Sequence, residues 1–146
     1  MLRSTTLGAF TALVMTIGGA GSVATATSST GAGAPDQGPT SWGSIKAPDQ
    51  VLRQGCRDYR FVYRITTPND EWQAEVFVTD PRGRAIASVL VDAGSNPSQA
   101  VTTFRTCRVS TTHGRFKLRM RVSYNVGYEK HVGFVKPAYF RLTRPR

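Results

Sequence analysis

The chain has 146 residues, of which 19 are Lys or Arg and 9 are Asp or Glu, so its formal net charge at pH 7 is +10. This length is sufficient for one domain with a modest core. The charge excess favours an anionic partner, such as an acidic polymer or surface, but it does not indicate a fold.

The N-terminus has the three parts of a secretory signal peptide. Met1–Arg3 supplies a positive charge, Leu7–Ile17 is mostly apolar, and Ala24–Ala26 has the A-x-A pattern of a cleavage site. The apolar run is shorter than the ~20 residues of a membrane-spanning helix. We predict a signal peptide at residues 1–26 and a secreted, extracellular protein. The alternative is an uncleaved N-terminal anchor.

A flexible leader is predicted at residues 27–44, because this segment consists of Ser, Thr, Gly, Ala and Pro with hardly any charge. Trp42 is the exception, and we expect its ring to dock onto the following domain as the first contact. The domain itself is predicted at residues 45–146.

From Ile45 onward, apolar and polar residues alternate with period two, and turn signals recur about every 8 to 12 residues. Asp80–Gly83 reads Asp-Pro-Arg-Gly, which is typical of a type I hairpin turn. No apolar pattern with helical spacing extends over three turns. We predict an all-β sandwich of six to seven strands. The expected strands are 50–54, 59–65, 72–79, 84–91, 100–107, 115–124 and 139–143.

Two cysteines, Cys56 and Cys107, lie within the predicted domain. In a small exported domain, such a pair most simply forms a disulfide. The loop-entropy relation gives a link across this span a stabilisation of about 4 kcal/mol. A metal site is the alternative, but His113 and His131 are the only histidines that could complete it. We therefore expect no metal.

The stretch Thr112–Leu118 resembles the start of the sixth strand of immunoglobulin-like domains, where Gly, Tyr and Cys follow at two-residue intervals. Gly114 matches the Gly, whereas Phe116 and Leu118 stand at the Tyr and Cys positions. The chain also resembles small exported actinobacterial proteins with one such domain. The resemblance implies an immunoglobulin-like β-sandwich over residues 47–146. Cys56 precedes the expected strand 59–65, and Cys107 precedes the expected strand 115–124. The disulfide is therefore expected to tie two strand entrances at one end of the sandwich.

Catalytic motifs are missing from the sequence. It contains no G-x-S-x-G, H-E-x-x-H, P-loop or G-x-G-x-x-G pattern, and disulfide-bonded cysteines cannot act as nucleophiles. We predict that the protein is not an enzyme and has no cofactor.

Positive charge is concentrated in the last third of the chain, where residues 105–146 contain eleven Lys or Arg residues and one acidic residue. Within it, Arg115, Lys117, Arg119 and Arg121 alternate with apolar residues, so they are predicted to share one face of a sheet at intervals of about 6.5–7 Å. This basic row is our first candidate site. The alternative is a solvated outer face whose arginines pair with acids on neighbouring strands.

A second candidate site is the predicted loop at residues 125–136, which contains Tyr128, Lys130, His131 and Phe134. Loops at the ends of sandwiches often form recognition surfaces. The alternative is that Tyr128 and Phe134 plug the end of the sandwich.

Two functions follow from these observations. The first is a non-catalytic extracellular binding module that contacts an anionic cell-wall polymer, a glycan or a membrane surface through the basic row. Specific nucleic-acid binding is not expected, because the aromatic residues of the same strand alternate onto the core side. The second is a secreted small-ligand carrier or protease-inhibitor-like protein, for which a concave apolar cleft or a long rigid loop would be required.

Overall fold

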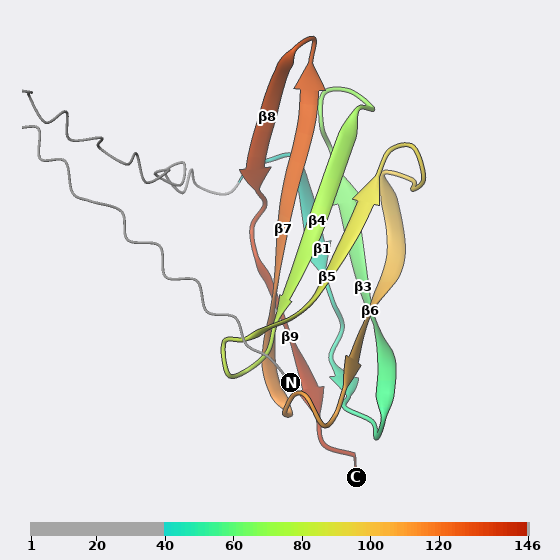
Figure 1. Ribbon diagram of the computed structural model, residues 1–146, viewed down its shortest axis with the longest axis vertical. Helices are drawn as coiled ribbons and strands as arrows, with labels where there is room; N and C mark the ends of the chain where they lie inside the picture. Colours follow the sequence, from blue (N-terminus) through green and yellow to red (C-terminus); the bar gives the residue numbers. More distant parts are fainter. Residues whose placement is uncertain (1–39, 146) are drawn as a thin grey trace, which may run out of the picture. The chain divides into compact units, whose positions relative to one another are not determined.

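The computed structural model describes residues 40–145, which form nine β-strands and no helix (Figure 1). Accordingly, this part of the chain has no helix that could cross a membrane. The predicted signal peptide and residues 27–39 of the predicted leader lie outside the described residues. The strands are β1 (Gly43–Lys46), β2 (Gln50–Val51), β3 (Cys56–Ile65), β4 (Trp72–Thr79), β5 (Ala85–Asp92), β6 (Gln99–Cys107), β7 (Gly114–Val126), β8 (Glu129–Phe134) and β9 (Ala138–Thr143).

The strands form two sheets, one with the order β1-β3-β6 and the other with the order β2-β9-β7-β4-β5. Neighbouring strands pair antiparallel, except for β2 and β9, which pair parallel. β7 is long enough to pair with two strands along one side. β9 pairs with Gly114–Leu118, and β8 pairs with Arg121–Val126. The prediction of an all-β fold with two sheets is confirmed.

Period-two alternation places one side of each long strand in a shared core. In β7, for example, Phe116, Leu118, Met120 and Val122 are fully buried. Aromatic rings join the two sheets across this core. Phe104 of β6 packs against Phe140 of β9, with ring centroids 5.9 Å apart, and Phe140 packs against Phe116 at 5.4 Å. The core therefore fixes which side of β7 faces outward.

The described residues contain two strands beyond the seven expected ranges. The first is β1, which begins within the segment predicted as leader and buries only the side chain of Ile45. A four-residue strand with one buried side chain gives no alternation signal, so the sequence pattern did not reveal it. Trp42, just before β1, packs edge-on against Tyr124 with ring centroids 4.9 Å apart. The expected docking of Trp42 is therefore confirmed.

The second unexpected strand is β8, which occupies half of the segment predicted as the loop 125–136. Residues Asn125 and Val126 continue β7, and Gly127 has a φ of 59°, a left-handed conformation that glycine adopts without strain. A tight hairpin therefore replaces the predicted loop. β8 has no fully buried side chain, so its sequence shows no apolar alternation.

The predicted turn at Asp80–Gly83 is present and connects β4 to β5. The Gly83 amide donates to the Asp80 carbonyl at 2.9 Å, and Gly83 has a φ of 81°. The buried Asp80 carboxylate accepts hydrogen bonds from the amides of Arg82 and Arg84 and from the Arg84 guanidinium at 2.8 Å. Burial alone would raise the pKa of Asp80, but the contacts with Arg84 and Arg82 outweigh it and lower the pKa.

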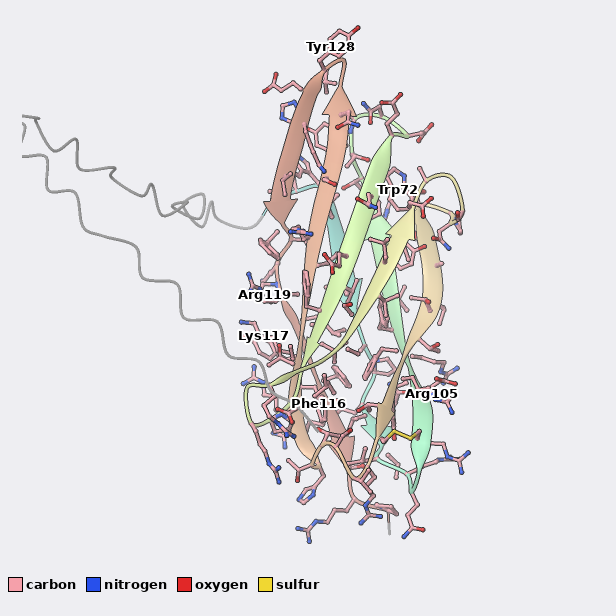
Figure 2. The ribbon with its side chains drawn as sticks, viewed as in Figure 1. Trp72, Arg105, Phe116, Lys117, Arg119 and Tyr128 are labelled. Carbon is pink, nitrogen blue, oxygen red and sulfur yellow. A yellow bond between two sulfur atoms is a disulfide. The ribbon has the colours of Figure 1, made fainter. Side chains whose placement is uncertain are left out.

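The disulfide between Cys56 and Cys107 is also present. Cys56 is the first residue of β3, Cys107 is the last residue of β6, and the two are direct partners in the register of these strands. The bond therefore lies at one end of the sandwich, as expected, but it links the start of β3 to the end of its neighbour β6 and not two strand entrances (Figure 2).

Candidate functional site

The outward side of β7 presents the four residues of the predicted basic row. Arg115, Lys117, Arg119 and Arg121 alternate with the buried residues of the core, so all four stand on the outer face of the larger sheet. Figure 2 shows Lys117 and Arg119 pointing away from the sandwich, whereas Phe116 points into it. We call this outer face, centred on these four residues, the basic face.

One member of the row is neutralised by an acid on the neighbouring strand. Arg121 lies opposite Glu75 of β4, and its Nη2 is 2.7 Å from the Glu75 Oε2. The expectation that outward arginines pair with acids across the sheet therefore holds for Arg121. Within residues 40–145, Arg115, Lys117 and Arg119 form no ion pair. These three cations leave the basic face with an unneutralised row of charge.

Two guanidinium groups of the row rest on aromatic rings from neighbouring strands. Arg115 lies over the ring of Tyr139 in β9, 4.0 Å from its centroid, and Arg119 lies over the ring of Phe134 in β8 at 4.3 Å. Such contacts stabilise by about 0.5–1 kcal/mol at exposed sites. They also restrict the rotamers of long side chains, which reduces the entropy lost when a ligand binds.

A third ring, that of Phe77 in β4, lies opposite Arg119 in the register and 5.8 Å from the Arg121 guanidinium. The sequence argument considered only the aromatics of β7 itself, all of which face the core. It missed that β4, β8 and β9 each bring an aromatic residue to the basic face. The period-two pattern of β4 does place Phe77 outward, so Phe77 could have been found once β4 and β7 were known to be neighbours.

The four residues of the second candidate site are divided among different places. Tyr128 projects from the tip of the β7–β8 hairpin, fully exposed (Figure 2), and does not plug the sandwich. Phe134 and Lys130 belong to the basic face. His131 stacks on Tyr124, with ring centroids 4.9 Å apart, on the opposite side of the hairpin. The structure therefore assembles no single site from these residues.

A shallow hollow of about 120 Å³ adjoins the row at Arg121. A second hollow, of about 170 Å³, adjoins the row at Arg115, and a third, of about 220 Å³, lies on the opposite sheet beside Lys46 and Arg64. All three are smaller than the roughly 300–1,000 Å³ of typical small-molecule pockets. The residues that line the first hollow are Gln73, Glu75, Leu90, Arg121, Ser123, Lys130 and Val132.

The two histidines lie at opposite ends of β7. His113 precedes the first residue of the strand and contacts Arg144, whereas His131 of β8 is opposite Tyr124. Eleven residue steps along the chain separate His113 from Tyr124, about 36 Å at ~3.3 Å per residue. In the described part of the chain, no group of three or more His, Cys, Asp or Glu residues could hold a metal ion.

The opposite sheet also has cations on its outer side, but in a different arrangement. Lys46, Arg60 and Arg64 are exposed on β1 and β3. Arg105 of β6 lies 3.6 Å from Asp58. In the described residues, none of these four cations lies over an aromatic ring. The two outer faces thus differ in whether aromatic rings support their cations. The opposite face therefore provides a control for experiments on the basic face.

Comparison with known proteins does not assign the chain to a family. No family model matches the sequence, and no curated protein is similar at a significant level. The fold and the site define the chain as a small, disulfide-linked β-sandwich protein with a basic sheet face.

Proposed function

We propose that this protein is a secreted, non-catalytic binding module that contacts an anionic polymer or surface through its basic face. The observation that carries the proposal is the row Arg115, Lys117 and Arg119, which has no acidic partner in the described residues and includes two guanidinium groups held on aromatic rings. Cell-wall polymers, acidic glycans and anionic membranes all present repeated negative charges, which suit a regular row of cations.

The physical basis is the arrangement of the charges on a rigid sheet. Outward residues of one strand are about 6.5–7 Å apart, so a linear polyanion can meet several cations without bending. The guanidinium groups form charge-assisted, bidentate hydrogen bonds with phosphate, sulfate or carboxylate. Because the rings of Tyr139 and Phe134 lie under these groups, the rings support them and are not free for base stacking.

We further propose that the sandwich is immunoglobulin-like. In that family, the strands A, B and E share one sheet and the strands G, F and C share the other. The orders β1-β3-β6 and β9-β7-β4-β5 support this assignment. The disulfide within one sheet and Phe116 in place of a tyrosine are departures from the family pattern.

Secretion is supported by the disulfide, which is compatible with an oxidising extracellular environment, and by the N-terminal sequence pattern. The alternative function of small-ligand carrier is not favoured, because the hollows are small and partly polar. The alternative of an inhibitor would depend on the hairpin tip at Tyr128. That tip is a tight turn and not the long rigid loop that this function was expected to need.

The experiment is a binding assay of the oxidised protein on isolated cell wall, an acidic polysaccharide, anionic vesicles and DNA across a salt series. The test variant replaces Arg115, Lys117 and Arg119 with Ala. The matched control replaces Lys46, Arg60 and Arg64 with Ala, which removes the same charge from the opposite face. Arg121 is left intact because its removal would leave Glu75 without its partner.

We expect the test variant to lose most of its affinity for one of these anions, while the control retains it. Each lost phosphate contact flattens the slope of log K against log salt by about 0.7–0.9, so three contacts give a change of about 2–3. Equal losses in the two variants would mean that binding reflects net charge alone, which would refute a site on the basic face.

A further inference from the structure

Within residues 40–145, strand β5 forms a free edge of the larger sheet, since it pairs with β4 on one side and ends the strand order on the other. Its segment Ala85–Val91 reads AIASVLV and contains neither charge nor proline. Proteins usually protect such edges with Lys, Pro, or very short strands. The other long edge, β6, includes Arg105, and the edges at β1 and β2 have only four and two residues.

The hydrogen bonds of the neighbouring pair reveal which backbone groups of β5 face outward. The Ala93 amide donates to the carbonyl of its opposite residue, Trp72, at 3.1 Å. Hydrogen-bonded and non-bonded pairs alternate along an antiparallel ladder, so Val91 and Val89 direct their backbone groups toward β4. Consequently, the N–H and C=O groups of Ser88 and Leu90 point away from β4. Asp92 lies two residues after Leu90, so its amide should also point away from β4. This amide donates to the Asn96 side chain, as expected for an outward group.

The side chains on this edge are compatible with pairing. Leu90 is 59% exposed and Ser88 is also exposed on the outer face, whereas Val89 is partly buried on the core side. Backbone groups with unused donors and acceptors, next to exposed apolar side chains, form the kind of edge to which another strand adds.

We propose that the β5 edge pairs with the β5 edge of a second copy of this chain. An antiparallel pair centred on Val89 places Ser88 opposite Leu90 of the second copy, and the reverse, so that the outward groups of both residues form four hydrogen bonds. The charges at this edge permit the same occupant, because segment 85–91 carries no charge and its flanking residue Asp92 is acidic, so the pairing places no two like charges opposite each other.

This pairing has a geometric consequence. The two-fold axis of such a pair is perpendicular to the sheet, so the two basic faces lie on the same side of one continuous sheet. A polymer that contacts both faces gains avidity, because the second contact is intramolecular. The pairing itself does not rest on the proposed function, since it requires no polymer.

The experiment measures self-association of the oxidised protein without any polymer. Sedimentation from about 10 µM to about 1 mM covers the range where a small edge contact is expected to act. We expect the average mass to rise toward that of a dimer. In the same range, hydrogen exchange at the amides of Ser88 and Leu90 should slow, while exchange in β6 should not change.

The test variant is Ser88→Pro, which removes an outward amide that β4 does not use and is therefore compatible with the monomer fold. We expect it to stay monomeric, whereas Ser88→Ala associates like the original chain. Leu90→Lys, which places a charge on the edge, provides a second test if Ser88→Pro fails to fold. The proposal is refuted if the original chain stays monomeric, if folded Ser88→Pro or Leu90→Lys associates as the original does, or if protection occurs at β6.

Discussion

The carboxylate of Asp80 illustrates how one residue can stabilise a turn. Its side chain is fully buried and bonds to two amides and to the Arg84 guanidinium, and it also accepts a hydrogen bond from Thr111. A buried charge is tolerated in this way only when its hydrogen bonds are satisfied. Pro81 and Gly83 made the hairpin turn recognisable from the sequence, whereas the contact of Asp80 with the distant Thr111 is visible only in the folded structure.

We therefore expect Asp80→Asn to lower the free energy of unfolding at pH 7 by about 2 kcal/mol, since hydrogen bonds to a charged group are lost. The pKa of Asp80 is lowered from its ordinary value of 3.8, so the stabilisation is present above about pH 4 and disappears as the pH falls through the lower, folded-state value. Urea unfolding should show the difference shrinking as the pH is lowered below about 4. A difference that stays constant with pH would contradict this account.

The aromatic rings beneath the arginines give a second test at the scale of residues. Phe134→Leu keeps an apolar side chain but removes the ring under Arg119. We expect a two- to five-fold loss of affinity for the polyanion, which corresponds to about 0.5–1 kcal/mol. The control is Tyr128→Leu, since Tyr128 is fully exposed at the hairpin tip. Equal effects of the two changes would show that the ring does not position Arg119.

At the scale of elements, strand length decided what the sequence could reveal. The alternating pattern of β3, β4 and β7 predicted these strands closely, because each buries four or five side chains on one side. β1 and β8 bury one side chain or none, so their formation depends on hydrogen bonding to β3 and β7. Their sequences alone contain no signal for this pairing.

The disulfide joins two of these elements, since it links the start of β3 to the end of β6. We expect the double substitution Cys56→Ala and Cys107→Ala to lower the unfolding free energy by about 4 kcal/mol, the loop-entropy value for a separation of 51 residues. Urea unfolding of the oxidised protein, the reduced protein and the double variant measures this effect. The reduced protein should match the variant, and a stability equal to that of the oxidised form would contradict the prediction.

At the scale of the whole molecule, the two sheets are joined by an aromatic cluster. Phe104 contacts Tyr59 and Phe61 within its own sheet and Phe140 in the other. We expect Phe104→Ala to cost about 3–5 kcal/mol, because it removes a fully buried ring and leaves a cavity. Fluorescence and circular dichroism should still report one shared unfolding transition. Two separate transitions would show that the sheets unfold independently.

The sequence by itself determined the all-β class, the pairing of the two cysteines, the turn at Asp80–Gly83 and the outward side of β7. These features depend on local alternation, turn chemistry and residue counts, which are properties of neighbouring positions in the chain. The tertiary structure alone decided which strands lie beside β7. That arrangement brings Phe134 and Tyr139 under the arginines, pairs Arg121 with Glu75, and leaves the β5 edge open, because contacts between distant segments form only when the whole chain packs.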